Sequence, residues 1–135
     1  MGEFLVKDSG ERTAFESGMV RDTASGKTDY TLIVDGPMLE RWAVHLTKGA
    51  AKYAKRNWTQ ANGPAELERF MESDMRHFLQ WFRGETDEDH ASAVFFNVNG
   101  AEFVKDKMRE SSTEVGSALS GYGLPRRWLE QRPVY

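Results

Sequence analysis

Apolar residues recur at helical spacing through most of the chain after residue 36. Pro37 suits the first turn of a helix. The apolar positions that follow are three or four residues apart, as a helix requires: Leu39, Trp42, Ala43, Leu46, Ala50, Tyr53 and Ala54. The same period predicts a second helix from about residue 65 to 83, ended by Gly84, and a third from about 87 to 110. The segment NWTQANGP between the first two predicts a loop.

The two ends of the chain lack this pattern. Residues 1–36 are rich in Gly, Ser, Thr and charge, and they predict an irregular arm with one short extended piece at residues 30–34. Residues 111–135 predict a linker and a tail. We therefore expect one all-α domain, a small bundle of three to four main helices whose core is residues 37–110.

Several polar residues fall on the apolar faces of the second and third predicted helices. At roughly 100° per residue, Asp74 projects into the middle of the apolar arc of the second helix, and His77 lies at the edge of that arc. On the third helix, His90 and Asn97 lie on the apolar face. Burying such groups costs on the order of 1–3 kcal/mol each unless they find hydrogen-bonding partners.

Two interpretations of these polar residues stay open. Together with Glu72, Asp87 and Asp89 they could bond to one another in a network that fixes the helix register, or they could surround a cation. Carboxylates that face each other across helices build divalent-metal sites in bundles. Oxygen-rich ligation suits Mg²⁺ or Mn²⁺, and histidine ligands favour Mn²⁺ or another transition metal.

The segment TKGAAKYAKRNW, residues 47–58, carries an unusual density of positive charge. If residues 37–58 are mostly helical, one face carries Arg41, His45, Lys48, Lys52, Lys55 and Arg56. That face is either a solvated surface or a phosphate-binding one. Asn57 and Trp58 follow at once, and cations beside an amide and an aromatic ring suit the recognition of a phosphate and a base. The arm adds two more cations, Arg21 and Lys27.

Composition limits the possible partners. Lys plus Arg is 18 against 21 Asp plus Glu, so a net charge of −3 argues against broad binding to polymeric nucleic acid or an anionic membrane. No apolar run approaches the length of a membrane span and no signal peptide is visible, so we expect a cytoplasmic protein. Cysteine is absent, which excludes disulfides. Four Trp and eight Phe are many for so few helices, and they predict a homo-oligomer.

Four segments, in order along the chain, resemble a known family. They are SGMVRDTASGKTDYTLI, GAAKYAKRNW, MRHFLQWFRGE and DEDHASAVFFN. They resemble the phage and bacterial dATP/dGTP diphosphohydrolase N-terminal domain, which is similar in organisation to the MazG-like all-α nucleotide pyrophosphohydrolases. The resemblance implies a MazG-like fold, a nucleotide as small-molecule substrate, and hydrolysis of a purine deoxynucleoside triphosphate to monophosphate and pyrophosphate with Mg²⁺ or Mn²⁺. A phage-encoded chain would work in the host cytoplasm.

The resemblance also implies residue roles. MazG-like enzymes hold their ions with an acidic pair on one helix and an acidic motif that opens the next, which implies the metal ligands Glu68, Glu72, Asp87 and His90. His90 stands where these relatives usually have an acid. Glu72 and His77 are the expected catalytic residues. The expected substrate-binding residues are Arg21, Lys27, Lys48, Lys52, Arg56, Asn57, Trp58, Arg76 and Asn97.

Two other functions compete with the enzyme. A non-catalytic protein that sequesters or senses nucleotides would keep the cationic face and need no metal. A structural protein would use the inward polar residues only to fix helix register.

Overall fold

The computed structural model describes residues 4–115 and divides the chain into two units, Met1–Val34 and Asp35–Tyr135. We describe each unit by itself. The linker and tail expected at residues 116–135 lie outside the described residues, so a fourth helix stays a prediction. None of the helices in the described part of the chain combines the length and the apolarity needed to cross a bilayer.

The N-terminal unit contains more local structure than the expected irregular arm. Strands β1 (Arg12–Ala14) and β2 (Val20–Asp22) pair antiparallel, with Arg12 opposite Asp22. The expectation of an extended piece at residues 30–34 was wrong, because Tyr30–Val34 forms a 3₁₀ helix. The carboxylate of Asp29 accepts hydrogen bonds from the backbone N–H of Thr31 at 2.9 Å and from its hydroxyl at 2.6 Å, and such local bonds favour a turn over a strand.

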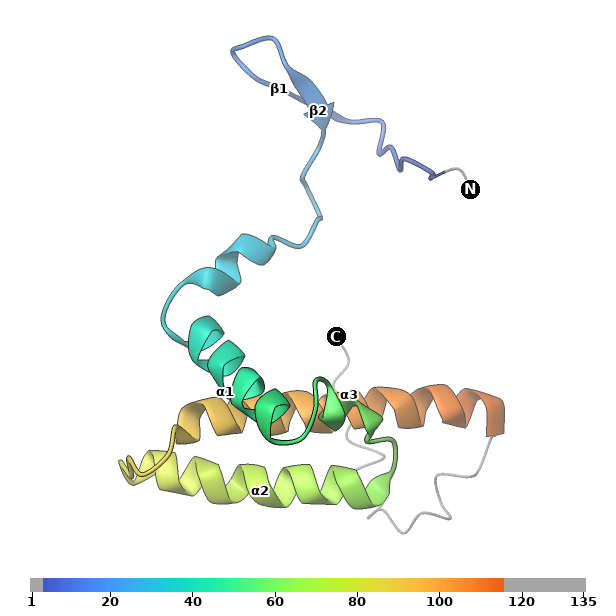
Figure 1. Cartoon of the computed structure of the whole chain (residues 1–135). Helices are drawn as coiled ribbons and strands as arrows, with labels where there is room; N and C mark the ends of the chain where they lie inside the picture. The colour runs from blue at the N-terminus through green and yellow to red at the C-terminus, as the bar shows by residue number, and fades with distance from the viewer. Residues whose placement is uncertain (1–3, 116–135) are drawn as a thin grey trace. The chain divides into compact units, whose positions relative to one another are not determined.

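Three α-helices make up most of the second unit, so the prediction of a mostly helical fold is confirmed (Figure 1). They are α1 (Met38–Lys52), α2 (Pro64–Phe82) and α3 (His90–Val115). Helix α1 ends before the basic segment does. Arg56 adopts a left-handed backbone conformation with φ 58°, and a short 3₁₀ helix, η2 (Asn57–Gln60), follows it.

Helix α3 begins three residues later than expected because Asp89 caps it. The Asp89 side chain accepts a hydrogen bond from the backbone N–H of Ser92 at 3.1 Å, which satisfies one of the free donors of the first turn. Residues 85–88 therefore stay outside the helix, in the short connection that follows α2.

Helices α2 and α3 run antiparallel side by side (Figure 1), since His77 meets His90 at one end and Phe70 lies against Gly100 further along. Their shared core gathers at the end away from the connecting turn. It consists of Ala61, Leu67, Ala101, Val104 and Met108, with Phe70 and Met71 packed against it. Apolar burial holds this end of the pair together.

Aromatic contacts join α1 and η2 to α3. The ring centroids of Trp42 and Phe95 are 6.4 Å apart, and those of Trp58 and Phe103 are 5.0 Å apart. The ammonium of Lys107 donates a hydrogen bond to the backbone carbonyl of Thr59 in η2. The segment that contains Trp58 is therefore fixed on α3 and does not follow α1 as a continuous helix.

We expect Gly100→Ala to destabilise the helical unit by about 1–3 kcal/mol through overpacking. A Cβ at position 100 would lie 2.5 Å from Cε1 of Phe70, so the two helices would have to separate. The matched control is Gly49→Ala in α1, where a Cβ meets nothing within 4 Å and the better helix propensity of Ala gains up to about 1 kcal/mol. Urea unfolding measures the free energy of unfolding of both variants. Equal changes in the two variants would contradict the close approach of Phe70 to Gly100.

Candidate functional site

Asp87 of the α2–α3 turn, His90 and His77 form a chain of hydrogen bonds in which His90 is buried and His77 is half-buried. Nδ1 of His77 lies 2.9 Å from Nδ1 of His90, and Nε2 of His90 lies 2.8 Å from Oδ1 of Asp87. His90 is only 2% exposed, whereas Asp87 is on the surface. The inward orientation predicted for His90 is confirmed, and its partners come from α2 and from the turn.

The proton positions in this chain follow from its donors and acceptors. An ionised Asp87 only accepts, so Nε2 of His90 carries the proton that is donated to it. Nδ1 of His90 is then an acceptor, and His77 donates its Nδ1–H to it. Burial lowers the pKa of His77, and the hydrogen bond from His90 lowers the pKa of Asp87. These two shifts favour a neutral His77 ring and an ionised Asp87 carboxylate.

Glu88 joins this pair. His77, Glu88 and His90 each offer one ligand atom, and these three atoms lie within 4.8 Å of one another. This position is consistent with the role of metal ligand expected for His90. Glu88 was missed because the third helix was expected to start at about residue 87, which would make Glu88 part of that helix. With α3 starting at His90, Glu88 belongs to the turn.

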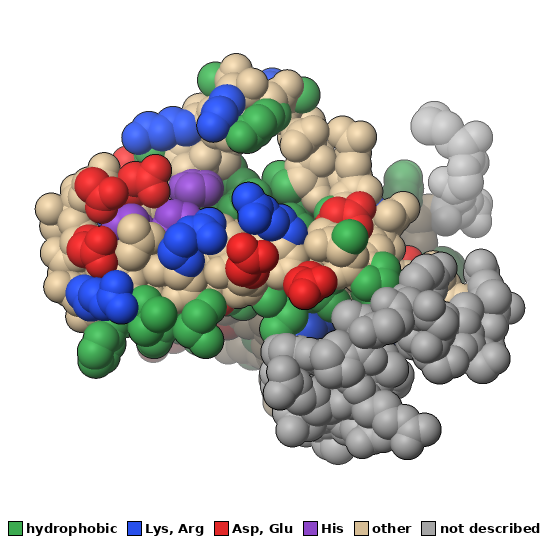
Figure 2. Space-filling view, turned by 90° about the horizontal axis from the view of Figure 1, so that it is seen from below, with side chains coloured by type: hydrophobic (Ala, Val, Ile, Leu, Met, Phe, Trp, Pro, Cys, Tyr) green, Lys and Arg blue, Asp and Glu red, His purple; other side chains and the backbone are tan. Residues whose placement is uncertain are grey.

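The start of α1 closes the other side of this region. The Arg41 guanidinium forms two hydrogen bonds with Asp89, at 2.8 and 2.5 Å, and lowers the pKa of that carboxyl to about 2. His45, one turn further along α1, lies 3.5 Å from the Ser92 hydroxyl and is half-buried. Burial lowers the pKa of His45 as well. All three histidines of the chain thus lie near the start of α3 (Figure 2).

A cavity of about 570 Å³ opens beside His45, between the end of α1, η2 and α3. Its wall includes Lys55, Arg56, Asn57 and Trp58. These are the last four residues of the basic segment, and three of them were expected to bind substrate. The volume lies in the range of about 300–1,000 Å³ typical of small-molecule sites.

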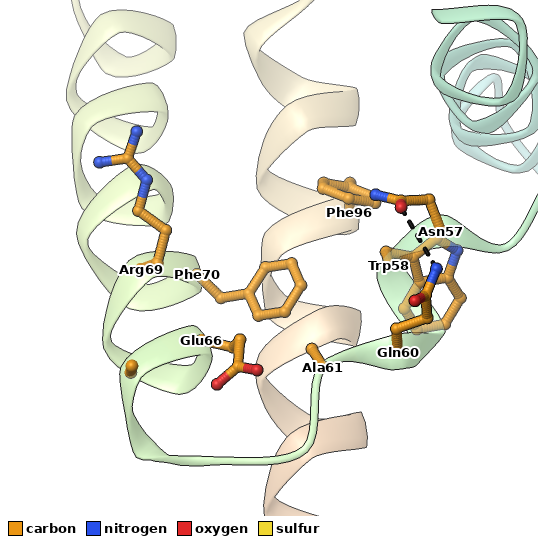
Figure 3. Close-up of a pocket in the computed structure, with 9 residues that line it drawn as sticks. Asn57, Trp58, Gln60, Ala61, Glu66, Arg69, Phe70 and Phe96 are labelled. Carbon is orange, nitrogen blue, oxygen red and sulfur yellow. Dashed lines mark hydrogen bonds between the residues drawn. The ribbon is translucent and has the colours of Figure 1, made fainter. Parts of the chain in front are cut away.

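A second cavity, of about 670 Å³, lies on the other side of the same wall (Figure 3). It shares Asn57, Trp58 and Phe96 with the first cavity, and α2 adds Glu66 and Arg69. Figure 3 shows the side chains of Asn57 and Gln60 together on η2, where the Gln60 amide donates to the Asn57 carbonyl at 3.4 Å. The two cavities therefore share amides and aromatic rings, and cations line both, Lys55 and Arg56 in the first and Arg69 in the second.

The other expected substrate-binding residues lie outside these walls. Lys48 and Lys52 are exposed on α1 and line neither cavity. Arg21 and Lys27 belong to the N-terminal unit, where the Lys27 ammonium lies 3.2 Å from Asp22. Arg76 donates to the Ser73 hydroxyl at 3.3 Å. Their substrate roles stay predictions.

Asn97 has partners within the protein. It is 4% exposed, and its amide donates to the carbonyl of Ala93 at 2.9 Å and to the hydroxyl of Ser73 at 3.4 Å. Its inward orientation was predicted. The hydrogen bonds make it a link between α2 and α3, and substrate binding by Asn97 stays a prediction.

The expected acidic ligands on α2 do not join the histidine pair. Glu68 and Glu72 are exposed, and Glu72 forms an ion pair with Arg69 at 3.6 Å. Neither belongs to the group of ligand atoms formed by His77, Glu88 and His90. The ligand roles of Glu68 and Glu72, and the catalytic role of Glu72, stay predictions.

The fold and the site define a small, mostly helical protein with ligand-sized cavities beside a cluster of histidines and acids. Residues 17–108 match the family described as dATP/dGTP diphosphohydrolase, N-terminal. This match spans more than half of the 135 residues, so the chain belongs to that family, and the resemblance inferred from the sequence is confirmed. Neither a curated protein nor a solved structure matches the chain.

Asp74, on the face of α2 that was expected to be apolar, has a carboxylate oxygen without a hydrogen-bonding partner. Its Oδ1 is buried and makes no hydrogen bond, and burial raises the pKa of its carboxyl. The raised pKa means that the ionised form opposes folding, so stability should increase as the pH falls through that pKa. We expect Asp74→Asn to raise the Tm at pH 7 by a few degrees, corresponding to about 1 kcal/mol.

The gain from Asp74→Asn should shrink towards pH 4, where the wild-type carboxyl binds its proton. Thermal melts followed by circular dichroism across this pH range measure it. Glu72→Gln, an exposed change on the same helix, is the control and should leave the Tm within about 1 °C. A lower Tm for Asp74→Asn at pH 7 would show that the carboxylate has a stabilising partner.

Proposed function

We propose that the chain hydrolyses dATP or dGTP to the deoxynucleoside monophosphate and pyrophosphate, with the nucleotide held in the cavities around Trp58. The observation that carries this proposal is the cavity lined by Lys55, Arg56, Asn57 and Trp58 next to His45. It unites the phosphate-binding and base-binding residue types on one short segment, and the family name supports the nucleotide substrate.

Phosphate binding falls to Lys55 and Arg56 in this proposal. A triphosphate carries several negative charges, and a guanidinium can bind two phosphate oxygens at once. Arg56 has a left-handed backbone, φ 58°, which a non-glycine residue adopts at a cost of about 1–2 kcal/mol. Such conformations cluster at functional sites, because they persist where they position a needed group.

Base binding falls to the rings and amides of the shared wall. Trp58 and Phe96 meet edge to face, with centroids 6.3 Å apart. Between them they offer apolar surface to both cavities, and Asn57 and Gln60 add donors and acceptors that can read the edge of a purine. The residues shared by the two cavities are therefore the ones that would distinguish nucleotides.

The reaction itself requires a water molecule and a proton acceptor. The water oxygen bonds to the α-phosphorus, the bond from that phosphorus to the bridging oxygen breaks, and pyrophosphate leaves. We assign to Nε2 of His77 the role of holding or transferring a proton in this reaction. Asp87 and His90 act on it by fixing the ring through their hydrogen bonds.

The Mg²⁺ that the resemblance implies does not fit the donor atoms that converge here. Mg²⁺ takes oxygen ligands in a near-octahedral shell. The convergent group offers two imidazole nitrogens and one carboxylate, and the expected acids Glu68 and Glu72 are exposed outside it. We derive no step through Mg²⁺.

The exposed Glu68 and Glu72 favour a second candidate function, nucleotide binding without turnover. The cavities supply recognition without any ion, so a protein that sequesters or senses nucleotides would use the same residues. Measuring products distinguishes the two functions, since only the enzyme releases pyrophosphate.

Arg56→Gly tests the proposed phosphate contact. Glycine accepts φ 58° without strain, so the Tm should stay equal or rise, while the affinity for dGTP should fall about 10-fold through loss of a charge-assisted bond. Arg109→Ala, which removes an exposed cation of α3 paired with Asp106, should leave affinity unchanged. Calorimetry in EDTA measures binding, and chromatography of dNTP reactions with Mg²⁺, Mn²⁺, Co²⁺ or Zn²⁺ measures products.

Folded protein that yields no dAMP or dGMP with any of these ions would refute the enzyme. If nucleotide binding persists in that case, the binding protein is supported instead. Equal dGTP affinity in wild type, Arg56→Gly and Arg109→Ala would refute the assignment of the cavity.

We also propose that the chain acts as a homodimer through α2. Met75, Phe78, Leu79 and Phe82 are 40–76% exposed along one stripe of this helix. Figure 2 shows hydrophobic side chains gathered along one edge of the helical unit. A contiguous apolar stripe on a described surface indicates a contact with another molecule.

The charges beside this stripe are arranged for a second, antiparallel copy. At 100° per residue, Glu72, Arg76 and Arg83 lie on one flank of the stripe, and Glu68 lies within it, between Met75 and Leu79. The acids precede Met75 and the arginines follow it. An antiparallel pair with a twofold axis at Met75 would therefore set Glu68 near Arg83 of the second copy.

Charge exchange tests this dimer. Glu68→Arg should weaken dimerisation about 10-fold, because the twofold axis creates two like-charge pairs. Adding Arg83→Glu should restore it, since the pairs regain opposite sign. Sedimentation velocity measures both variants. A wild-type monomer at high micromolar concentration, or a double variant no better than the single one, would contradict the proposed contact.

A further inference from the structure

The three side chains that converge at the α2–α3 turn form a donor set with a chemical preference. Two are imidazoles and one is a carboxylate, and their ligand atoms lie within 4.8 Å of one another. Nitrogen donors of this kind suit Zn²⁺ and its neighbours in the first transition row, whereas Mg²⁺ prefers oxygen. We propose that His77, Glu88 and His90 bind one divalent transition ion of the Zn²⁺ and Co²⁺ class, and that Mg²⁺ is excluded there.

The imidazole pair already has the separation that a shared ion requires. Zn–N bonds are roughly 2.0–2.1 Å, so two nitrogens on one ion lie roughly 3.0–3.4 Å apart. The two Nδ1 atoms are 2.9 Å apart. Both lone pairs cannot face each other at this distance without a positive centre between them. A proton serves in the metal-free chain, and an ion can replace it after a small separation of the rings.

Asp87 supplies the support that metal-bound histidines need. Its carboxylate accepts the Nε2–H of His90 at 2.8 Å, which leaves Nδ1 of that ring as the lone-pair donor. Carboxylates in this position fix the tautomer and the orientation of a ligating histidine and strengthen its binding. Asp87 is therefore a positioning residue for the ion, and not the ligand that the sequence predicts.

The surrounding charges favour a cation at this point. Glu88 is exposed, and its carboxylate places a negative charge beside the two rings. The neighbouring Asp89 is already committed to Arg41. A three-residue set leaves open positions on the ion, as in catalytic sites with three protein ligands.

The ion site and the nucleotide cavities are separable. In the ion-bound state Nδ1 of His77 binds the ion and its proton sits on Nε2, so Nε2 can accept a proton only in the ion-free chain. His45 lines the cavity of about 570 Å³, and it is not one of the three proposed ligands. The ion site does not depend on the nucleotide, and its test needs none.

The test is titration of the EDTA-treated full chain with Co²⁺, followed by its visible absorption, and with Zn²⁺ and Mg²⁺ by calorimetry. We expect one Co²⁺ or Zn²⁺ per chain and binding of Mg²⁺ at least about 100-fold weaker. His77→Gln should weaken Co²⁺ binding at least 100-fold. Asp87→Asn should weaken it about 10–100-fold while one ion per chain still binds.

Two control variants separate the site from the rest of the chain. His45→Gln removes the third histidine, and Glu72→Gln removes an expected ligand on α2; neither should change Co²⁺ affinity. His77 is half-buried, so circular dichroism will show whether His77→Gln is folded, and Glu88→Gln at the exposed turn gives a second ligand variant. Co²⁺ affinity that is unchanged in both ligand variants, absence of Co²⁺ and Zn²⁺ binding, or tighter binding of Mg²⁺ overturns the proposal.

Discussion

The close approach of α2 to α3 at Gly100 is the constraint on which the site depends. With hydrogen in place of a side chain at this position, the Phe70 ring lies directly against the α3 backbone. The antiparallel register set there places residue 77 opposite residue 90, where two imidazole nitrogens come within 2.9 Å. A shift by one helical residue would turn His90 by about 100° and separate the pair.

The helix pair divides into an apolar end and a polar end. Leu67, Val104 and Met108 fill the end away from the turn with hydrocarbon. Towards the turn, Asn97 and His90 replace apolar residues on the same face, and each is satisfied in a different way. Asn97 bonds back to its own helix at Ala93, whereas His90 needs partners from the turn and from α2. Asn97 also reaches the Ser73 hydroxyl of α2, but only the His90 arrangement brings together side chains that can titrate or bind a metal, so a site can form there.

The sequence predicted the parts of this structure that depend on periodicity. The three helices and the inward positions of His90 and Asn97 follow from the 3.6-residue repeat, which tertiary packing did not override. Glu88 was missed because its position depends on where Asp89 caps α3, and element boundaries depend on local hydrogen bonds that periodicity does not encode. The left-handed Arg56 and the β1–β2 pairing are equally local. Glu68 and Glu72 came from a resemblance, and on α2 they lie beside the exposed stripe.

The basic segment and the histidine group require opposite charges beside them: a phosphate-binding cation should have no acid next to it, whereas a metal-binding imidazole benefits from one. Within the described residues no ion pair joins Lys55 or Arg56 to an acid, and two acids of the α2–α3 turn are bonded elsewhere, Asp89 to Arg41 and Asp87 to His90. An acid beside Arg56 would compete with a phosphate for the guanidinium. An acid beside the imidazoles instead favours a cation. The cations after α1 and the acids near the start of α3 are therefore separate. This arrangement suits a nucleotide whose phosphates contact the cations after α1 and a metal ion near the start of α3.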